Sequence, residues 1–214
     1  MKAGIIGSGI VGQVLAKAFK QEGYEVLLGT RDVTKEDVVK FGSENAGIAV
    51  GTFEDAARFG DIIVLSVKGT AAEEAVRLAG KYNFENKIVI DTTNPIADQP
   101  PVNGVLQFFT GPNESLLEKL QALVPSAKFV KAFNSVGNTL MYKPQLKDKP
   151  TMFIAGNDEE ARKTVTDIVS SFGWETADMG KAEAARAIEP LCMLWCIPGF
   201  LQNDWQHAFK LLKT

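Results

Sequence analysis

The chain has 214 residues and a formal net charge of −3, and 45% of its residues are hydrophobic. This length predicts one α/β domain with a small appendage, and the scattered basic residues argue against a nucleic-acid-binding surface. Met1-Lys2 leads into a short strand rather than the apolar region of a signal peptide. The longest unbroken apolar run, Leu191 to Ile197, has seven residues, whereas a membrane span needs roughly 20. We therefore expect a cytoplasmic protein without a nucleic-acid or membrane partner.

The N-terminal segment has the order strand, glycine-rich turn, helix and strand. Residues 2–6 are a short apolar strand that leads directly into G-x-G-x-x-G at residues 7–12. Apolar residues then recur with helical spacing until Gly23, and residues 24–29 predict a second strand. This context favours a dinucleotide-binding loop over the alternative, a glycine-rich turn kept only for packing.

Each glycine of the motif occupies a position that binding of a pyrophosphate requires. Gly7 permits a sharp turn after the strand, Gly9 has no side chain to keep a phosphate off the backbone, and Gly12 lets the helix pack closely on the strand. Unpaired N–H groups at the helix N-terminus would then bind the phosphates. The expected cofactor contacts in this loop are Gly7, Ser8, Gly9, Ile10 and Val11.

The residues after the second strand indicate which dinucleotide binds. An NAD site usually has an acidic residue there, which accepts hydrogen bonds from the ribose 2′-OH. This strand instead ends in Thr30 and Arg31, whose hydroxyl and guanidinium suit a 2′-phosphate, and Lys35 is a third donor. Asp32 is the alternative acid, but it lies one position too far past the strand and is interpreted as the N-cap or turn residue before a helix at 34–41. The pattern favours NADP.

The rest of the chain continues to alternate between strands and helices. The nearly continuous apolar run 61–67 is typical of a strand buried on both faces of a parallel sheet. We therefore predict an α/β fold with a Rossmann, doubly wound, mostly parallel sheet. Residues 1–178 would form the dinucleotide-binding domain, and 179–214 a small helical segment. The other expected elements are strands 47–50, 87–91, 127–134, 151–156 and 175–178, helices 54–59, 70–82, 113–124 and 158–172, and capping boxes 70–73 and 115–118.

Ligands in doubly wound folds bind beyond the carboxyl ends of the strands, so the loops there are candidate site residues. Ser66, Val67 and Lys68 are expected to line the adenosine half of the cofactor, and the alternative for Lys68 is a solvated loop residue. Asn94 precedes a proline in a loop that would bring a backbone group near the nicotinamide. The segment 96–112 is rich in proline and glycine and predicts an irregular loop over the active site.

The strand 127–134 brings three further residues, Ala132, Phe133 and Asn134, to the same edge of the sheet. We expect the carboxamide of Asn134 to hydrogen-bond the nicotinamide amide, with the ring of Phe133 packed beside it. The alternative is an aromatic residue that ends the strand, followed by a turn asparagine.

The C-terminal segment, 181–214, is helical in composition and rich in large apolar residues, and Pro190 and Pro198-Gly199 are predicted to break it. It has more apolar surface than one amphipathic helix needs. We therefore expect it either to wrap the sheet or to close the pocket over the hydride site and pair two subunits.

The two cysteines, Cys192 and Cys196, are spaced to lie on one helix face, where they could bind a metal together with His207. No second cluster of ligands completes such a site. The favoured interpretation is a pair of buried free cysteines, with no metal.

Four motifs together resemble a known family: Ile5 to Gly12, Gly29 to Arg31, Asp91 to Pro95, and Val130 to Asn134. The set is similar to the NADP oxidoreductase, coenzyme F420-dependent family, which includes NADPH:deazaflavin reductases and the cytoplasmic reductase domain of the STEAP metalloreductases. The resemblance covers nearly the whole chain. It implies a Rossmann domain with a small C-terminal helical part, NADP held by Thr30 and Arg31, and hydride transfer to a flavin-like ring.

The expected function is therefore that of an NADPH-dependent oxidoreductase, acting as a homodimer on a small-molecule acceptor such as coenzyme F420 or FMN. Hydride transfer between two rings depends on orientation more than on an acid or base, and the strand-end loops contain no evident acid/base pair. One alternative is a carbonyl or imine reductase, although the 36 residues after Asp178 leave little room for a substrate domain. The other is a non-catalytic NADP sensor. Family members often have proline where this chain has Lys68, which affects the acceptor pocket.

Overall fold

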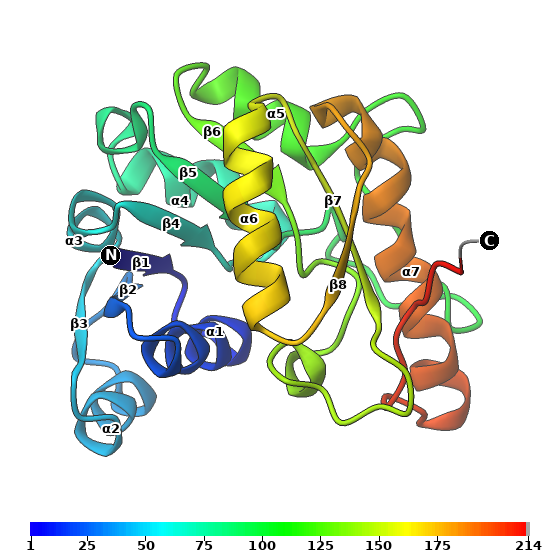
Figure 1. Ribbon diagram of the computed structural model, residues 1–214, viewed down its shortest axis with the longest axis horizontal. Helices are drawn as coiled ribbons and strands as arrows, with labels where there is room; N and C mark the ends of the chain where they lie inside the picture. Colours follow the sequence, from blue (N-terminus) through cyan, green and yellow to red (C-terminus); the bar gives the residue numbers. More distant parts are fainter. Residues whose placement is uncertain (213–214) are drawn as a thin grey trace.

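One sheet of eight strands forms the centre of the protein, and the computed structural model describes residues 1–212 (Figure 1). The strands are β1 Lys2–Ile6, β2 Glu25–Thr30, β3 Ile48–Thr52, β4 Ile62–Leu65, β5 Ile88–Asp91, β6 Lys128–Lys131, β7 Thr151–Gly156 and β8 Glu175–Asp178. Their order across the sheet is β3-β2-β1-β4-β5-β6-β7-β8. Neighbouring strands are parallel except β6 and β7, which are antiparallel. The predicted doubly wound, mostly parallel sheet is confirmed.

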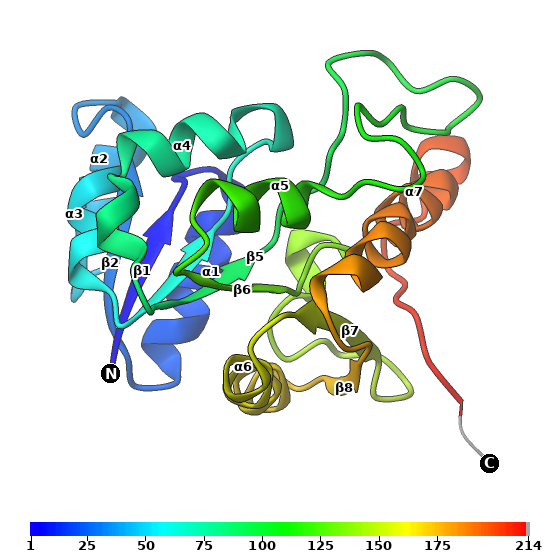
Figure 2. The same ribbon diagram turned by 90° about the horizontal axis from the view of Figure 1, so that it is seen from above.

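Helices cover both faces of this sheet (Figure 2). They are α1 Ile10–Gln21, α2 Glu36–Glu44, α3 Phe53–Phe59, α4 Ala72–Leu78, α5 Leu116–Leu123, α6 Glu159–Ser171 and α7 Ala185–Gln202. Short 3-10 turns are formed by Gly69–Ala71, Lys81–Phe84, Asn138–Leu140 and Ala182–Ala184. Helices α1 and α6 pack on one face, and α3, α4 and α5 pack on the other.

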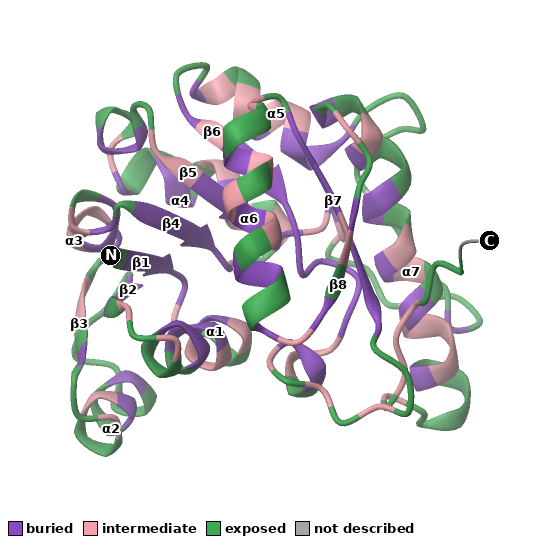
Figure 3. Ribbon diagram, viewed as in Figure 1, coloured by how far each residue is buried: buried purple, intermediate pink, exposed green. Residues whose placement is uncertain are grey.

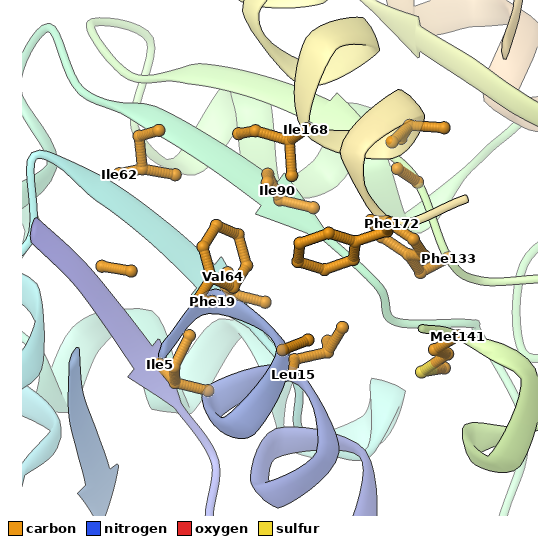
Figure 4. Close-up of a cluster of buried hydrophobic side chains, with 14 of the residues drawn as sticks. Ile5, Leu15, Phe19, Ile62, Val64, Ile90, Phe133, Met141, Ile168 and Phe172 are labelled. Carbon is orange, nitrogen blue, oxygen red and sulfur yellow. The ribbon is translucent and has the colours of Figure 1, made fainter. Parts of the chain in front are cut away.

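Two hydrophobic clusters, one on each face, hold these layers together. Successive strand residues point to opposite faces, so Ile5 and Ile6 of β1 belong to different clusters. In the cluster under α1 and α6, the ring of Phe19 packs edge-on against Phe172 (Figure 4). The central strands are buried along almost their whole length (Figure 3). This double burial explains why their sequences are continuous apolar runs.

Two helix starts show where local sequence signals succeed and fail. Ser115 caps α5 as predicted, because its hydroxyl accepts a hydrogen bond from the Glu118 N–H. The predicted capping box of Thr70 and Glu73 is wrong. The chain there forms a 3-10 turn, α4 begins only at Ala72 without a side-chain cap, and Glu73 instead pairs with Arg77. Helix α4 also ends at Leu78, short of the predicted residue 82.

The C-terminal helix α7 is continuous, so the predicted breaks at Pro190 and Pro198 are wrong. Each proline removes one backbone hydrogen bond, but burial of Ile188, Cys192 and Trp195 holds the helix against the rest of the protein. Residues 204–212 are not helical and contact the start of β7, where the Thr151 N–H donates to the Phe209 carbonyl at 2.9 Å. Part of the predicted helical segment is therefore not helical.

The segment Ala182–Gln202 is long and apolar enough to cross a membrane by length and composition alone. Its 18-residue apolar window is 33% buried inside the structure. The buried core helix of a soluble protein can pass the same test of length and hydropathy.

A fully buried ion cluster joins the sheet to α7. Lys131, at the end of β6, lies 2.6 Å from the Asp91 carboxylate of β5 and 2.8 Å from the Glu189 carboxylate of α7. Its Nζ also donates to the Thr93 carbonyl at 2.7 Å. Burial disfavours the lysine charge, but the attraction of both carboxylates outweighs burial and raises the pKa of Lys131. Lys131 is therefore a charged residue in the core.

The Glu189 carboxylate of this cluster also binds the start of α5. It accepts hydrogen bonds from the N–H groups of Leu116 and Leu117, at 2.9 and 3.0 Å. These are among the N–H groups that an α-helix cannot satisfy internally, and the helix dipole favours a negative charge there. The elements β5, α5, β6 and α7 therefore meet at one group of charges, and α7 reaches it from the C-terminal part of the chain.

We expect Lys131→Met to destabilise the protein by about 3–5 kcal/mol, because it leaves two carboxylates buried without a cation. The matched control is Lys128→Met on the same strand, whose partly exposed ion pair with Asp158 is worth about 1 kcal/mol or less. Urea unfolding at pH 7 measures both. Equal losses for the two variants would show that the cluster is not a major source of stability. Since the pKa of Lys131 is raised, its contribution is present at neutral pH and is lost only as the pH rises through that elevated pKa.

Candidate functional site

A cleft follows the carboxyl ends of the parallel strands and has two connected parts. The first, called here the Arg31 cavity, has a volume of about 500 Å³, and its lining includes Gly7, Ser8, Thr30, Arg31 and Lys35. The second, the Asn94 cavity, has a volume of about 760 Å³, and its lining includes Ile10, Val11, Thr92, Thr93 and Asn94. Both parts share Gly9, Ser66, Val67 and Lys68. The cleft lies where the strand order reverses beside β1, the usual ligand position in this fold.

The glycine loop has the shape that a dinucleotide needs. Gly7 has φ of +121°, which favours glycine, and a Cβ at Gly12 would lie 1.8 Å from the Gly7 carbonyl oxygen. A Cβ at Gly9, in contrast, would meet no protein atom within 4 Å, although Gly9 lines both cavities. Helix α1 begins at this point with no side-chain cap and no acidic residue in its first turn. These residues fit a pyrophosphate against the helix N-terminus.

Two side chains hold the glycine loop by hydrogen bonds to its backbone carbonyls. The Ser66 hydroxyl donates to the Ile6 carbonyl at 3.1 Å. The Gln13 amide donates to the Ser8 carbonyl at 3.0 Å. Ser66 therefore supports the loop that binds a phosphate, in addition to lining the cleft.

The end of β2 positions the groups that were predicted to recognise a 2′-phosphate. The Ser8 hydroxyl donates to the Thr30 hydroxyl at 3.1 Å, which ties the glycine loop to this strand end. Arg31 is exposed at the cavity, and the structure of residues 1–212 shows no ion pair for it. Lys35 also lines the cavity, but its Nζ lies 2.8 Å from the carboxylate of Asp37. Of these two cations, Arg31 is the one without a carboxylate partner.

Asp32 forms a local turn. Its carboxylate accepts hydrogen bonds from the Thr34 N–H at 2.8 Å and from the Thr34 hydroxyl at 2.6 Å. These bonds lower the pKa of Asp32, the side-chain bond most strongly. The N-cap of α2 is Lys35, so of the two roles expected for Asp32 the structure shows the turn and not the cap. Its carboxylate already has donors within its own turn, which disfavours a role as the ribose-binding acid.

Asn94 and Asn134 hydrogen-bond to each other at the far end of the cleft. The Asn94 amide donates to the Asn134 carbonyl at 2.8 Å, and the Asn134 amide donates to the Asn94 side-chain oxygen at 3.0 Å. Asn134 also donates to the Ile188 carbonyl of α7 at 3.0 Å. Only Asn94 lines the cavity, and Asn134 is buried behind it. The structure therefore shows Asn134 as a support for Asn94 rather than as an open cofactor contact.

Ala132 and Phe133 do not line either part of the cleft. The expectation that the Phe133 ring lies beside the nicotinamide is wrong, because this ring is in the core, 5.6 Å from the ring of Phe172 (Figure 4). The backbone explains the difference, since Phe133, the second residue after β6, adopts φ of +59°. This turn directs its ring towards α6.

Two residues of the cleft, Asp98 and Gln99, were missed from the sequence. They belong to the irregular segment 96–112 and line the Asn94 cavity. The Asp98 carboxylate lies 3.0 Å from the Nζ of Lys68, which lines the same cavity. No local motif marks Asp98, because its position depends on how a long loop folds back over the sheet.

The two cysteines show no sign of a metal centre. Among residues 1–212, no group of three or more potential side-chain ligands is placed to hold a metal ion. A hydrogen bond with Cys196, together with burial, raises the pKa of the Cys192 thiol. His207 instead stacks on Trp195, with 5.1 Å between the ring centroids. Both cysteines are free, as expected, but only Cys192 is buried, whereas Cys196 is partly exposed.

The fold and the glycine loop define a class, the Rossmann reductases that bind a nicotinamide dinucleotide. Residues 2–95 match the family model described as NADP oxidoreductase coenzyme F420-dependent. The description of this family names an NADP oxidoreductase, and the match covers the N-terminal part of the chain. The resemblance found in the sequence is confirmed.

Named relatives extend the similarity beyond residue 95. The chain is 29% identical over 205 residues to metalloreductase STEAP3 of Rattus norvegicus. The aligned region covers 94% of this chain but only 39% of STEAP3. It is 26% identical over 183 residues to the F420-dependent NADP reductase of Methanocaldococcus jannaschii, which covers 79% of each. The chain therefore spans well under half of the STEAP protein.

Solved structures agree with this assignment. A protein from Arthrobacter sp. FB24 with the provisional name F420-dependent NADP reductase superposes with a TM-score of 0.93 at 27% identity, over 100% of both chains. An imine reductase from Myxococcus stipitatus in complex with NADP+ has a TM-score of 0.67 at 17% identity and shares the fold, over 95% of this chain and 63% of that one.

We expect Gly9→Ala to weaken NADPH binding and Gly12→Ala to lower stability. At Gly9 the new methyl group meets open space in the cleft, so stability should fall by less than about 1 kcal/mol. NADPH should bind about 10-fold or more weakly, because the methyl group keeps a phosphate off the backbone N–H groups. At Gly12 the methyl group collides with the Gly7 carbonyl, which should cost about 1–3 kcal/mol of stability. Thermal unfolding and NADPH titration distinguish these outcomes, and normal NADPH affinity in the Gly9 variant would contradict a phosphate site here.

Proposed function

We propose that this protein transfers a hydride between NADPH and a flavin-like acceptor, either coenzyme F420 or FMN. The observation that carries the proposal is the form of the cleft. One end has a hydroxyl and a guanidinium beside a glycine loop. The other is the larger Asn94 cavity, whose described lining residues include one ion pair, Lys68 with Asp98, and no acid/base pair. Transfer between two preformed rings needs only that they be held close and correctly oriented.

The cofactor is proposed to be NADP, with its 2′-phosphate at Thr30 and Arg31. Thr30 is buried and fixed by Ser8, whereas Arg31 is exposed at the cavity. A guanidinium provides several N–H donors in a fixed plane, which matches the oxygens of a phosphate. The pyrophosphate would then lie at Gly9, and the nicotinamide in the Asn94 cavity.

The residues of the chain contribute binding and orientation to the proposed reaction. NADPH, when bound, supplies the hydride. Ile10 and Val11 form an apolar part of the wall where the rings would meet, which helps to exclude water. Asn94, held by Asn134, fixes the far end of the same cavity. Hydride transfer to a flavin-like ring requires no further side chain to act as nucleophile.

The relatives support this acceptor class to different degrees. The reductase of Methanocaldococcus jannaschii has F420 and NADP in its name, and the chain covers most of its length. The activity of the much longer STEAP3 protein is not assigned to this chain. The homodimer and the cytoplasmic location expected from the sequence stay predictions.

The experiment that tests the proposal is a titration of the purified protein with NADPH and with NADH, followed by addition of coenzyme F420, FMN or a cyclic imine. We expect selective NADPH binding and enzyme-dependent oxidation of NADPH by F420 or FMN. Turnover of the imine alone would replace the proposal by an imine reductase. Tight NADPH binding without turnover of any acceptor would indicate a sensor.

Arg31→Ala tests the cofactor assignment. Loss of a charge-assisted hydrogen bond to the 2′-phosphate should cost roughly 1.5–3 kcal/mol, or about 10- to 100-fold in NADPH affinity. NADH affinity should hardly change, since NADH lacks that phosphate. Arg58→Ala is the matched control, because Arg58 is an exposed arginine outside the cleft. Equal losses for the two cofactors in the Arg31 variant would contradict the assignment.

A further inference from the structure

An ion pair lines the cleft at the point where its two parts join. The Nζ of Lys68, just after β4, lies 3.0 Å from the carboxylate of Asp98, which belongs to the segment 96–112. The two side chains are 79% and 66% exposed. They are 30 residues apart in sequence, so the contact exists only because this segment folds back over the sheet.

Lys68 holds a position that no other charged residue among residues 1–212 has in this cleft. It lines both the Arg31 cavity and the Asn94 cavity, and it shares this position with Gly9 of the glycine loop. A ligand that extends from Arg31 to Asn94 must therefore pass Lys68. On the proposed cofactor, the part that passes Gly9 is the pyrophosphate, which is its second centre of negative charge.

Of the acidic residues that line the described cleft, Asp98 is the one that pairs with Lys68. Asp37 pairs with Lys35, Glu74 lies 3.7 Å from Arg77, and the Asp32 carboxylate accepts hydrogen bonds from Thr34. Asp98 pairs with Lys68 itself. A phosphate that enters the cleft therefore competes only with Asp98 for this lysine.

We propose that Lys68 exchanges Asp98 for the pyrophosphate when the dinucleotide binds, so that cofactor binding releases the segment that covers the acceptor cavity. This inference rests on the proposed function, because it assumes that the cleft takes a dinucleotide. It goes further by proposing that Lys68 binds either Asp98 or the pyrophosphate, so that Asp98 competes with the cofactor for this lysine.

The energetics favour such an exchange. An exposed lysine–carboxylate pair is worth little, so breaking it costs little. A pyrophosphate carries more negative charge than one carboxylate and offers several acceptor oxygens, so it is the stronger partner for an ammonium group. The exchange therefore needs no large rearrangement of the sheet.

The exchange would affect the acceptor cavity through the segment that carries Asp98. Ile96, Ala97, Asp98 and Gln99 all line that cavity. Farther along the segment, Gly104 packs closely on Leu201 of α7, where a Cβ would lie 2.9 Å from the leucine side chain. The middle of the segment is thus held by α7, while the Asp98 side chain is held by an exposed ion pair that a ligand can break.

The test is a double-mutant cycle with Lys68→Met, Asp98→Asn and the double variant, in which NADPH and NADH dissociation constants are measured by calorimetry without acceptor. We expect K68M to weaken both cofactors equally, about 3- to 10-fold, because both carry the pyrophosphate. D98N should tighten both by about 2- to 5-fold, since the competing carboxylate is gone. This gain should disappear when D98N is combined with K68M.

Other outcomes overturn the exchange. If K68M weakens NADPH alone, Lys68 recognises the 2′-phosphate and not the pyrophosphate. If K68M changes neither cofactor but raises the KM for FMN relative to riboflavin, Lys68 binds the phosphate of the acceptor. If D98N gives the same gain with and without K68M, the two residues do not compete for one site.

Matched controls separate these results from general effects of charge and from failure of the proposed function. Lys163→Met and Glu160→Gln remove members of another exposed ion pair, on α6, at 2.8 Å, and should leave both dissociation constants unchanged. A wild-type protein that binds neither NADPH nor NADH would refute the dinucleotide site itself. Binding by the wild type, combined with unchanged affinities in K68M and D98N, would refute only the exchange.

Discussion

The structure depends on one buried cation, Lys131, which is held between the carboxylates of Asp91 and Glu189. A charge with no access to water must be paired completely, so β5, β6 and α7 can take only the relative positions that satisfy it. Glu189 also binds the first N–H groups of α5. The cluster therefore sets the position of α7 against the sheet, although α7 comes last in the chain.

The ion cluster also affects the cleft, because it lies on the same strands as Asn94 and Asn134. Asn94 lies three residues after Asp91, and Asn134 lies three residues after Lys131, so the same two strand ends carry the cluster and this pair. Asn134 donates to the carbonyl of Ile188, the neighbour of Glu189 in α7. The far wall of the Asn94 cavity is thus fixed by the buried charges below it. A wall held in this way suits a reaction that depends on the orientation of two rings.

The near end of the cleft is fixed in a different way. There, backbone geometry determines the shape, through the positive φ of Gly7 and the close approach of Gly12 to the glycine loop. Between the two fixed ends, Lys68 and Asp98 are exposed and weakly paired. The two ends of the cleft are therefore held by buried charges and by backbone geometry, whereas its middle is lined by an exposed ion pair.

By itself, the sequence determined the doubly wound sheet, the glycine loop and the polar strand ends, because these follow from local patterns: apolar runs, required glycines and the residues that end each strand. Thr30, Arg31, Ser66 and Asn94 lie along the cleft for this reason. Only the tertiary structure decided the rest. The direction of the Phe133 ring depends on a backbone turn, and the unbroken course of α7 past two prolines depends on what it packs against. The partners of Lys131 and Lys68 come from distant parts of the chain, and no local pattern can specify which charges will meet once the chain has folded.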